Sequence, residues 1–407
     1  MPGALSHVRV LDLSRILAGP WAGQMLADLG ADVIKVERPG AGDDTRGWGP
    51  PWLKDEQGAD TSVAAYYLCA NRNKRSITID ITQAEGQALV RRLAAESDVV
   101  LENFKVGGLA QYGLDYDSLK AVNPRLVYCS ITGFGQDGPY APRAGYDFLI
   151  QGLGGLMSIT GRPDGEEGGG PMKVGVALTD ILTGLYATNA VLAALAWRDK
   201  SGEGQYIDMA LLDVQVACLA NQAGNYLATG QSPQRLGNAH PNIVPYQDFP
   251  TADGYMILAI GNDGQFARFC AAAGAPQLAT DERFATNRAR VVNRTTLIPL
   301  LKKLTIERST AEWIATLEAL AVPCGPINTL ADVFADPQVQ ARGLKVTMPH
   351  PVAGQVPLVA SPMKLSATPV DYRLPPPMLG EHTDEILAAT LGLDAAAIAR
   401  LRADGVV

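Results

Sequence analysis

Histidine and cysteine are both scarce in this chain of 407 residues. Five cysteines form no CxxC pair, so we expect reduced thiols rather than a disulfide framework or a zinc site. The sequence also contains neither G-x-S-x-G nor HExxH, the motifs of many serine hydrolases and zinc proteases. Neither a histidine-based triad nor a metal site is predicted, because the four histidines are scattered singly: His7, His240, His350 and His382.

An excess of positive charge is also missing, since 34 lysines and arginines face 42 aspartates and glutamates and leave a net charge of −8. An acidic surface repels phosphate backbones and anionic lipids, so nucleic acid and membranes are not expected as partners. Residues 1–14 show neither a secretion signal nor an arginine-rich leader. No uninterrupted apolar run reaches about 18 residues, so we expect no membrane-spanning helix and a cytoplasmic location.

Strands and helices alternate over the first 150 residues. The segment 8–13 (VRVLDL) is typical of a buried strand, 20–29 (PWAGQMLADL) of a helix and 32–37 (DVIKVE) of a second strand. This strand–helix–strand unit predicts a parallel sheet with a right-handed crossover. We predict a doubly wound α/β domain, with further strands at 76–80, 98–101 and 126–131 and further helices at 84–96 and 116–121.

One predicted helix, 180–197, is apolar nearly all round, so we expect it to be buried. A strand at 204–209 and a helix at 211–228 follow it. The helix begins with Asp180, and aspartate is among the favoured residues at a helix N-cap. The alternative is that this carboxylate, held against an apolar wall, acts as a nucleophile on a carbonyl group. The local pattern by itself favours the cap.

The rest of the chain changes in composition. Residues 216–250 are interpreted as a linker, because the stretch 229–250 is rich in Gly, Pro, Asn and Gln. A hairpin-like segment at 251–261 and several helices predict a second, smaller α+β domain over 251–330. Strands and proline-rich turns follow, and the tail contains a last predicted helix at 384–391.

The run Gly133–Gly138 (GFGQDG) fits G-x-G-x-x-G and follows a predicted strand. A dinucleotide fingerprint must also open a helix, so that the pyrophosphate meets the helix N-terminus. Pro139 and Pro142 follow almost at once, which predicts a loop instead. The first strand–helix turn, SRILAGPWAG, lacks the glycine spacing as well. The sequence therefore indicates a Rossmann-type scaffold without a nicotinamide or flavin site.

Basic residues gather in two places early in the chain, at Arg38 with Arg46 and in the run 71–75 (NRNKR). One interpretation is a solvated surface, and the other is a site for the phosphates of a nucleotide-like cofactor. Arg38 follows a predicted strand at the carboxyl edge of the sheet, where open α/β sheets bind their ligands. The pattern leaves both interpretations open.

Several distant motifs together resemble the class III CoA-transferases, also called the CaiB/BaiF type. The resemblance extends over nearly the whole chain. Within the family the chain is most similar to the branch that exchanges CoA between succinyl-CoA and glutarate, by its PGAGDDTRGWGPPW and HPNIVPYQDFPTADGY segments. The family motifs are LDLSRILAGPWAGQMLADLGADVIKVERPGAGDDTR, NRNKRSI, ENF, GQDGPYAPRAGYD, VGVALTDILTGLYA, GNDGQF, VPCGPI and LGEHTDEIL.

The resemblance implies a fold, an assembly and partners. It implies a Rossmann-like large domain from residues 1–215 and 331–407, with a smaller α+β domain inserted at 251–330 after the linker 216–250. Two subunits are expected to interlock as a homodimer. Acyl-CoA and a dicarboxylic acid are the expected small-molecule partners. No cofactor is expected to be bound permanently, because coenzyme A itself is the substrate carrier.

The resemblance also implies roles for single residues. Asp180, in the VALTD motif, matches the catalytic aspartate and is expected to form an aspartyl-CoA thioester. Gln111 stands where some members have a basic residue, and Lys105 is a substitute for that phosphate contact. The loop that shields the intermediate matches Gly261, Asn262, Asp263, Gly264 and Gln265. The other CoA contacts match Ile16, Leu17, Arg38, Ile79, Asp80, Asn103, Phe104, Arg143 and Tyr146.

Two other functions stay open from the sequence, an α-methylacyl-CoA racemase and a non-catalytic acyl-CoA-binding protein. The racemase branch has a histidine where this chain has Tyr146. An unperturbed tyrosine has a pKa of about 10, which is poorly matched to proton abstraction at neutral pH.

Glutarate is the acceptor acid that we expect first, ahead of itaconate, malate and hydroxymethylglutarate. The sequence does not choose the arginine for the distal carboxylate among Arg15, Arg46, Arg72 and Arg162.

Overall fold

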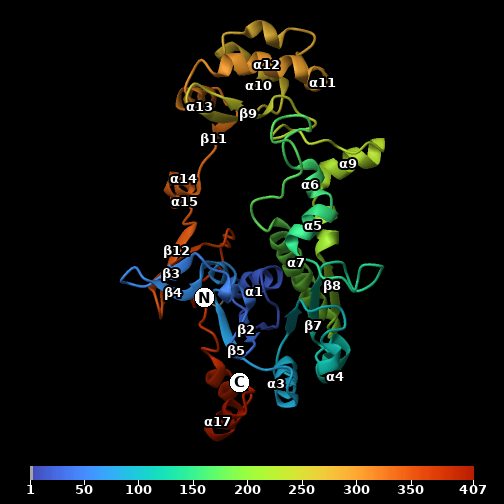
Figure 1. Cartoon of the computed structure of the whole chain (residues 1–407), viewed down its shortest axis with the longest axis vertical. Helices are drawn as coiled ribbons and strands as arrows, with labels where there is room; N and C mark the ends of the chain where they lie inside the picture. The colour runs from blue at the N-terminus through green and yellow to red at the C-terminus, as the bar shows by residue number, and fades with distance from the viewer. Residues whose placement is uncertain (1–2) are drawn as a thin grey trace. The chain divides into compact units, whose positions relative to one another are not determined.

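The computed structural model of the chain describes residues 3–407 (Figure 1). Two compact units divide these residues, and we call them the sheet unit and the small unit. The sheet unit contains the chain up to Leu156 together with Val174–Ala223 and Pro337–Val407. The small unit contains Met157–Lys173 and Gly224–Asp336.

A six-stranded parallel sheet forms the centre of the sheet unit and confirms the prediction of an α/β fold with a large parallel sheet. The strand order is β5-β2-β1-β6-β7-β8, and all neighbours are parallel. The order reverses between β1 and β6, and open α/β sheets bind ligands beside such a reversal. The predicted strands are confirmed within two residues: β1 (Arg9–Asp12), β2 (Asp32–Glu37), β5 (Lys74–Thr78), β6 (Val99–Glu102), β7 (Val127–Thr132) and β8 (Tyr206–Ala210).

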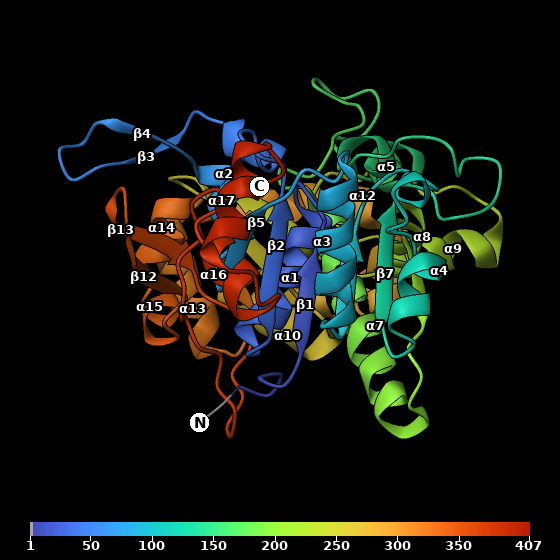
Figure 2. The ribbon, with the colours of Figure 1, turned by 90° about the horizontal axis from the view of Figure 1, so that it is seen from below.

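Helices cover both faces of this sheet. Successive residues of a strand point to opposite faces, so Val10 of β1 packs with helices α1 and α7, whereas Leu11 packs with α3 and α16. Figure 2 shows α3 and α16 on the near side of the strands. Burial on both faces explains the apolar residues on both faces of β1 and β6, whereas β2 and β5 also contain the buried lysines Lys35 and Lys74. The helices are α1 (Ala18–Asp28), α3 (Ala84–Ala95), α4 (Tyr116–Val122), α7 (Leu178–Ser201), α16 (Thr383–Ala389) and α17 (Ala395–Ala403).

The prediction that the helix now assigned as α7 is buried is wrong for the single chain. One side packs closely on α1, since a Cβ added to Gly184 would lie 2.8 Å from the carbonyl oxygen of Ala18. The other side exposes Tyr186 and Trp197, at 45% and 56%. By length and a mean hydropathy of 1.3, α7 is a candidate membrane span, which the sequence did not predict. This is weak evidence, because core helices of soluble proteins pass the same test and 44% of the window is buried.

The predicted helix 211–228 is in fact two helices, α8 (Leu211–Ala217) and α9 (Ala220–Thr229). The break lies where Ala220 has a left-handed φ of +44°, which a continuous right-handed helix cannot contain. The shorter elements of the N-terminal half are β3 (Trp52–Lys54), β4 (Asp60–Ala64), α2 (Ala65–Leu68), α5 (Asp147–Leu153), α6 (Leu156–Ile159) and 3₁₀ turns at Asp44–Gly47 and Ala110–Tyr112.

An antiparallel sheet of order β11-β10-β9 organises the small unit. The hairpin predicted near 251–261 is confirmed, because β10 (Tyr255–Ala259) pairs with β9 (Tyr246–Pro250). Strand β9 lies within 216–250, so the segment expected as a linker is partly structured. Phe249, Phe269 and Trp313 belong to a separate apolar core. The other elements are α10 (Asp263–Ala272), a 3₁₀ turn (Pro276–Ala279), α11 (Asn287–Val292), α12 (Arg294–Thr305), α13 (Thr310–Ala319), β11 (Cys324–Pro326) and α14 (Leu330–Ala335).

The C-terminal segment returns to the sheet unit. The amide of His382 donates to the carbonyl of Ser76 at 2.9 Å, and the amide of Asp80 donates to the carbonyl of Val406 at 2.8 Å. The predicted helix 384–391 is confirmed as α16, whereas α17 was not predicted, although Asp394 caps it. The remaining elements are α15 (Pro337–Ala341), β12 (Lys345–His350) and β13 (Gly354–Val359).

The buried Arg290 provides a test of the small unit. Its guanidinium donates to the carbonyls of Val244 and Phe284, at 2.7 and 2.9 Å, and to Asp263 Oδ1 at 2.7 Å. Arg290→Met leaves the carbonyls of the buried residues Val244 and Phe284 without these donors and is expected to destabilise the protein by about 2–4 kcal/mol in denaturant unfolding. The exposed Arg288→Met on the same helix is the control. Equal stability of the two variants would contradict the anchoring role.

Candidate active site

A pocket of about 530 Å³ lies in the sheet unit, at the carboxyl ends of its strands. The chain leaves β1 at Asp12 and β6 at Glu102, on either side of the reversal in strand order, and the segments that follow both ends line the pocket. Asp180 lines it too. So do all ten residues predicted as CoA contacts: Ile16, Leu17, Arg38, Ile79, Asp80, Asn103, Phe104, Lys105, Arg143 and Tyr146.

Asp180 is not the N-cap of its helix, contrary to the interpretation that the local pattern favours. Helix α7 begins at Leu178, its N-cap is Ala177, and Asp180 is therefore the third helical residue. Among residues 3–407, no donor forms a hydrogen bond with the Asp180 carboxylate. Burial, and secondarily the charge of Asp147, raises the pKa of Asp180 to about 7. A partly buried carboxylate that receives no hydrogen bond is poorly stabilised as an anion, which favours attack on a carbonyl carbon.

The cap comes instead from Asp147, a residue that the sequence analysis did not select. Its Oδ1 accepts from the amides of Thr179 and Asp180, at 2.8 and 3.2 Å. Asp147 is the first residue of α5 and directly follows Tyr146 in the GYD part of a family motif. Its place in the family motif was the feature of the sequence that could have identified Asp147. That α5 packs at the start of α7, however, is visible only in the fold.

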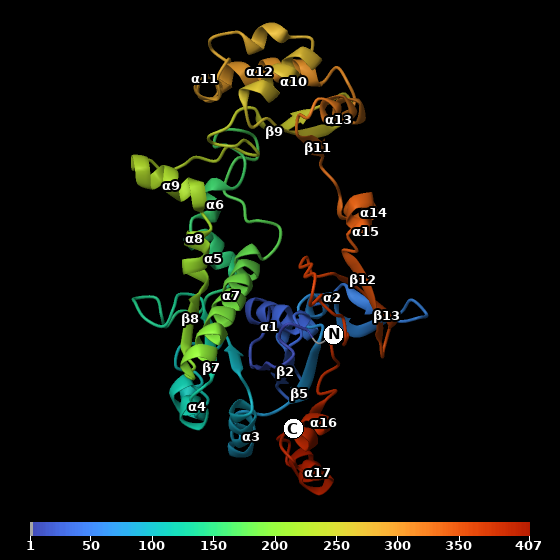
Figure 3. The ribbon, with the colours of Figure 1, turned by 180° about the vertical axis from the view of Figure 1, so that it is seen from behind.

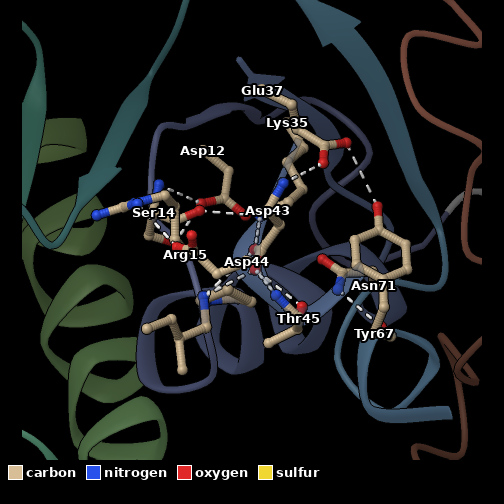
Figure 4. Close-up of polar contacts among 12 residues, drawn as sticks. Asp12, Ser14, Arg15, Lys35, Glu37, Asp43, Asp44, Thr45, Tyr67 and Asn71 are labelled. Atoms are coloured by element: carbon tan, nitrogen blue, oxygen red, sulfur yellow. Dashed lines mark hydrogen bonds and ion pairs between the residues drawn. The ribbon is translucent and has the colours of Figure 1, made fainter. Parts of the chain in front are cut away.

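Two buried ion pairs adjoin the pocket, and we call Asp12, Lys35, Asp43 and Lys74 the ion network. Figure 4 shows Asp12, Lys35 and Asp43 of this network with the polar residues around them. Lys35 Nζ lies 2.9 Å from Asp43 Oδ2, and Lys74 Nζ lies 3.0 Å from Asp12 Oδ2. All four side chains are fully buried. Burial lowers the pKa of Lys74 to about 8. Burial disfavours the charge of Asp43 as well, but Lys35 and the hydrogen bonds from Thr45 together lower the pKa of Asp43 to about 2.

The ion network shapes the turn that leaves β1. Lys35 Nζ donates to the carbonyl of Ser14 at 2.9 Å, and the amide of Ile16 donates to Asp43 Oδ1 at 3.2 Å. Ile16 has a left-handed φ of +73°, which is strained for a β-branched residue and costs about 1–3 kcal/mol. Asn103 holds the same turn from β6, because it accepts from the amide of Arg15 and donates to its carbonyl. Two predicted contact residues, Ile16 and Asn103, are therefore positioned together.

The suggestion of a phosphate site in the run 71–75 is wrong. Arg72 pairs with Asp28, Lys74 with Asp12, and Arg75 with Asp32 and Glu385, so these cations are neutralised within the protein. None of them lines the pocket.

Arg46 is also paired within the protein, because its guanidinium donates to both carboxylate oxygens of Glu37 at 2.7 Å. Of the four arginines considered for a distal carboxylate, Arg15 lines the pocket of the sheet unit. Arg162 belongs to the small unit. The cationic side chains around the pocket are Arg15, Lys35, Arg38, Lys105 and Arg143, and Gln111 lines it beside them.

Two predicted loops have different outcomes. The run Gly133–Gly138 forms a loop and opens no helix, as predicted from its prolines. The segment 261–265 lies in the small unit and is only partly a loop, because Asp263 begins α10. Asn262 caps that helix by accepting from the amide of Gln265 at 2.9 Å. The catalytic role of Gly261–Gln265 stays a prediction.

Comparison with known proteins gives consistent matches. A sequence model of CoA-transferase family III matches residues 5–383. A succinate–glutarate CoA-transferase of Agrobacterium fabrum is 57% identical over 94% of this chain and 95% of its own length. A human succinyl-CoA:glutarate CoA-transferase is 45% identical over 99% of this chain and 90% of its own length. The crystal structure of a CaiB/BaiF family protein from Brucella suis, 55% identical, aligns with a TM-score of 0.84 over 96% of this chain and 100% of that one.

The ion network predicts an asymmetric response to mutation. Lys35→Met leaves Asp43 buried without its cation and is expected to destabilise the protein by about 3–5 kcal/mol in denaturant unfolding. Lys35→Met combined with Asp43→Leu removes both charges and is expected to recover much of that loss. Lys364→Met, at an exposed site of the same unit, is the control. A double variant less stable than the single variant would contradict charge pairing as the cause.

Proposed function

Because this chain belongs to CoA-transferase family III, we propose that it transfers CoA from succinyl-CoA to glutarate through a covalent intermediate on Asp180. The observation that supports this most directly is the pocket itself. It brings a partly buried carboxylate that receives no hydrogen bond in the described chain together with every residue predicted to contact CoA. The names of the similar Agrobacterium and human enzymes support succinate and glutarate as the two acids that exchange CoA.

The first half of the proposed reaction loads CoA onto the enzyme. Asp180 attacks the thioester carbonyl of succinyl-CoA, the C–S bond breaks, and a mixed anhydride and CoA thiolate form. The thiolate then attacks the aspartyl carbonyl of the anhydride. Succinate leaves, and an aspartyl-CoA thioester remains. These steps divide one exchange between poor nucleophiles into two activated substitutions.

The second half repeats these steps in reverse. A glutarate carboxylate attacks the aspartyl-CoA thioester and releases the thiolate again. The thiolate attacks the glutaryl carbonyl of the new anhydride, which frees Asp180 and gives glutaryl-CoA. Because anhydrides hydrolyse, the site must exclude water during these steps. We assign shielding and oxyanion stabilisation to the segment Gly261–Gln265, as the family resemblance implies.

The pocket supports separate roles for its cations. Arg38, Lys105 and Arg143 are assigned to the phosphates of CoA, since guanidinium and ammonium groups bind phosphate oxygens strongly. Arg143 also lies over the rings of Phe134 and Tyr140, at 5.1 and 4.5 Å from their centroids, which restrains its direction. No cofactor is required by these steps.

Arg15 is assigned to the distal carboxylate of the acid. Its pairing with Asp44 at 2.8 Å is half exposed and therefore weak enough to exchange for a substrate. Diacids that differ by one methylene change binding by only about 1–3 kcal/mol, so the acceptor range is expected to be broad.

We also propose that the functional form is a homodimer. The support is the resemblance to the family and the apolar surface that a single chain leaves exposed on neighbouring helices. Phe148 of α5 and Trp197 of α7 are 59% and 56% exposed, so each helix presents a large apolar side chain that a second subunit could cover. The inserted nature of the smaller domain and a cytoplasmic location are part of the same proposal.

The nucleophile is tested by Asp180→Asn and Asp180→Ala. Both are expected to lower the formation of glutaryl-CoA from succinyl-CoA and glutarate at least ~10³-fold, while CoA esters still bind. Mass spectrometry measures the product. Hydroxylamine added during turnover is expected to convert Asp180 of the wild type to a hydroxamate. Asp213→Asn, on the exposed side of α8, is the control. A fully active Asp180→Ala variant would refute the assignment, and binding without transfer in the wild type would indicate an acyl-CoA-binding protein.

The raised pKa of Asp180 predicts an effect on stability. Its folded-state pKa of about 7 lies above the ordinary value of 3.8, so its contribution is most favourable below pH 3.8 and is lost as the pH rises through 7. Asp180→Asn removes this buried charge and is expected to unfold at a higher temperature than the wild type at pH 8. The advantage, on the order of 1–4 kcal/mol, shrinks as the pH falls from 7 toward 5. An advantage independent of pH would show that ionisation is not its cause.

A further inference from the structure

We propose that Asp147 is a positioning residue for Asp180, because it occupies the free amides at the start of α7 and so denies them to the nucleophile. This inference rests on the proposed function, in which Asp180 attacks the thioester. The first amides of any helix lack partners within that helix and attract the nearest carboxylate. At the start of α7 two carboxylates compete for them, and the structure assigns them to Asp147.

The carboxylates of Asp147 and Asp180 differ in the hydrogen bonds that they accept. Asp147 Oδ1 accepts from the amides of Thr179 and Asp180, whereas the N-cap residue Ala177 offers no side-chain acceptor. Asp180 contributes its own amide to this cap, and its carboxylate receives no donor in the described chain. If Asp147 were absent, the same amides would be available to stabilise the anion of Asp180 and weaken it as a nucleophile.

Buried amide side chains hold Asp147 in this position. Gln151, which is fully buried, donates to Asp147 Oδ2 at 2.7 Å and accepts from the amide of Val174 at 2.9 Å. Thr179, also buried, donates its hydroxyl to Gln215 Oε1 of α8 at 2.6 Å. Figure 3 shows α5, α7 and α8 side by side, in agreement with their packing. The cap is therefore built from three helices and does not depend on a mobile surface side chain.

The charge of Asp147 acts in the same direction as the hydrogen bonds. After burial, it is the second cause of the raised pKa of Asp180. Acylation converts Asp180 from an anion into a neutral anhydride or thioester, so repulsion by Asp147 is relieved when the intermediate forms. A fixed negative charge close to the nucleophile thus favours the acylated state relative to the free carboxylate.

Other charged groups around α7 do not compete with this effect. Tyr66 of α2 is near Asp180, but burial and that carboxylate raise the pKa of Tyr66 to about 12, so it is neutral. The remaining acids on elements packed against α7 have partners or are exposed to solvent: Asp28 pairs with Arg72, Asp208 accepts from the amide of Gln136, and Asp213 is exposed.

Two substitutions of Asp147 distinguish the effect of its hydrogen bonds to the helix amides from the effect of its negative charge. Asp147→Asn keeps a carbonyl oxygen that accepts from the two amides but removes the charge, and Asp147→Ala removes both. Asp213→Asn is the matched control, because it removes an exposed acid from a neighbouring helix. The measured quantity is the single-turnover rate of Asp180 acylation by succinyl-CoA between pH 5 and 9, with the intermediate trapped by hydroxylamine. Binding of CoA and thermal unfolding are measured in parallel.

The wild type is expected to lose activity as the pH falls through about 7, where Asp180 becomes protonated. In Asp147→Asn this acid limb is expected to move ~1 pH unit or more lower, because a nearby negative charge has been removed. Its plateau rate is expected to fall about tenfold, because a less basic carboxylate is a weaker nucleophile, while CoA binding is unchanged. Asp147→Ala is expected to lose still more rate, because the freed amides then bind Asp180.

A purely structural role would not move the acid limb. A folded Asp147→Asn variant with the acid limb and plateau of the wild type would therefore overturn the proposal, even if Asp147→Ala failed to fold. That result is distinct from failure of the proposed function, in which the wild type itself would yield product without any hydroxamate on Asp180.

Discussion

Two lysines whose side chains are fully buried next to two buried aspartates are the constraint on which the pocket depends. Burial of a charge is costly, and partners at hydrogen-bond distance offset that cost. Because Lys35 also binds the carbonyl of Ser14 and Asp43 binds the amide of Ile16, these ions hold the turn after β1 as well as the core. The strained φ of Ile16 persists for the same reason.

The pocket thus combines two opposite electrostatic arrangements. In the ion network each of the four buried charges has a partner of opposite sign. At the start of α7 the charge of Asp180 lacks a partner, and the charge that acts on it, Asp147, is another acid. Uncompensated charge reduces stability, and proteins retain it where reactivity requires a basic group. The stability of the ion network is what allows such a site to persist within a folded protein.

Much of the scaffold was predictable from local patterns. Strands β1, β2 and β6 are buried on both faces, and each has consecutive apolar residues that identify it as a buried strand. The predictions were wrong where the role of a residue depends on distant parts of the chain. The cations of 71–75 looked available for phosphate, but their partners lie 44 and 62 residues away, at Asp28 and Asp12. Likewise, apolar composition predicted a buried α7, although one side of it is open in the single chain.

Sequence by itself determined the family and the strands of the parallel sheet in the first 150 residues, and it selected Asp180 of the VALTD motif as the proposed nucleophile. Those properties depend on local periodicity or on motifs that are contiguous in the chain. Tertiary structure alone decided which cations face the pocket, that Ile16 adopts a left-handed backbone, and that Asp147 rather than Asp180 caps α7. These outcomes depend on which groups meet across distant segments, because the strength and sign of an electrostatic interaction are set by distance and burial and not by separation along the chain.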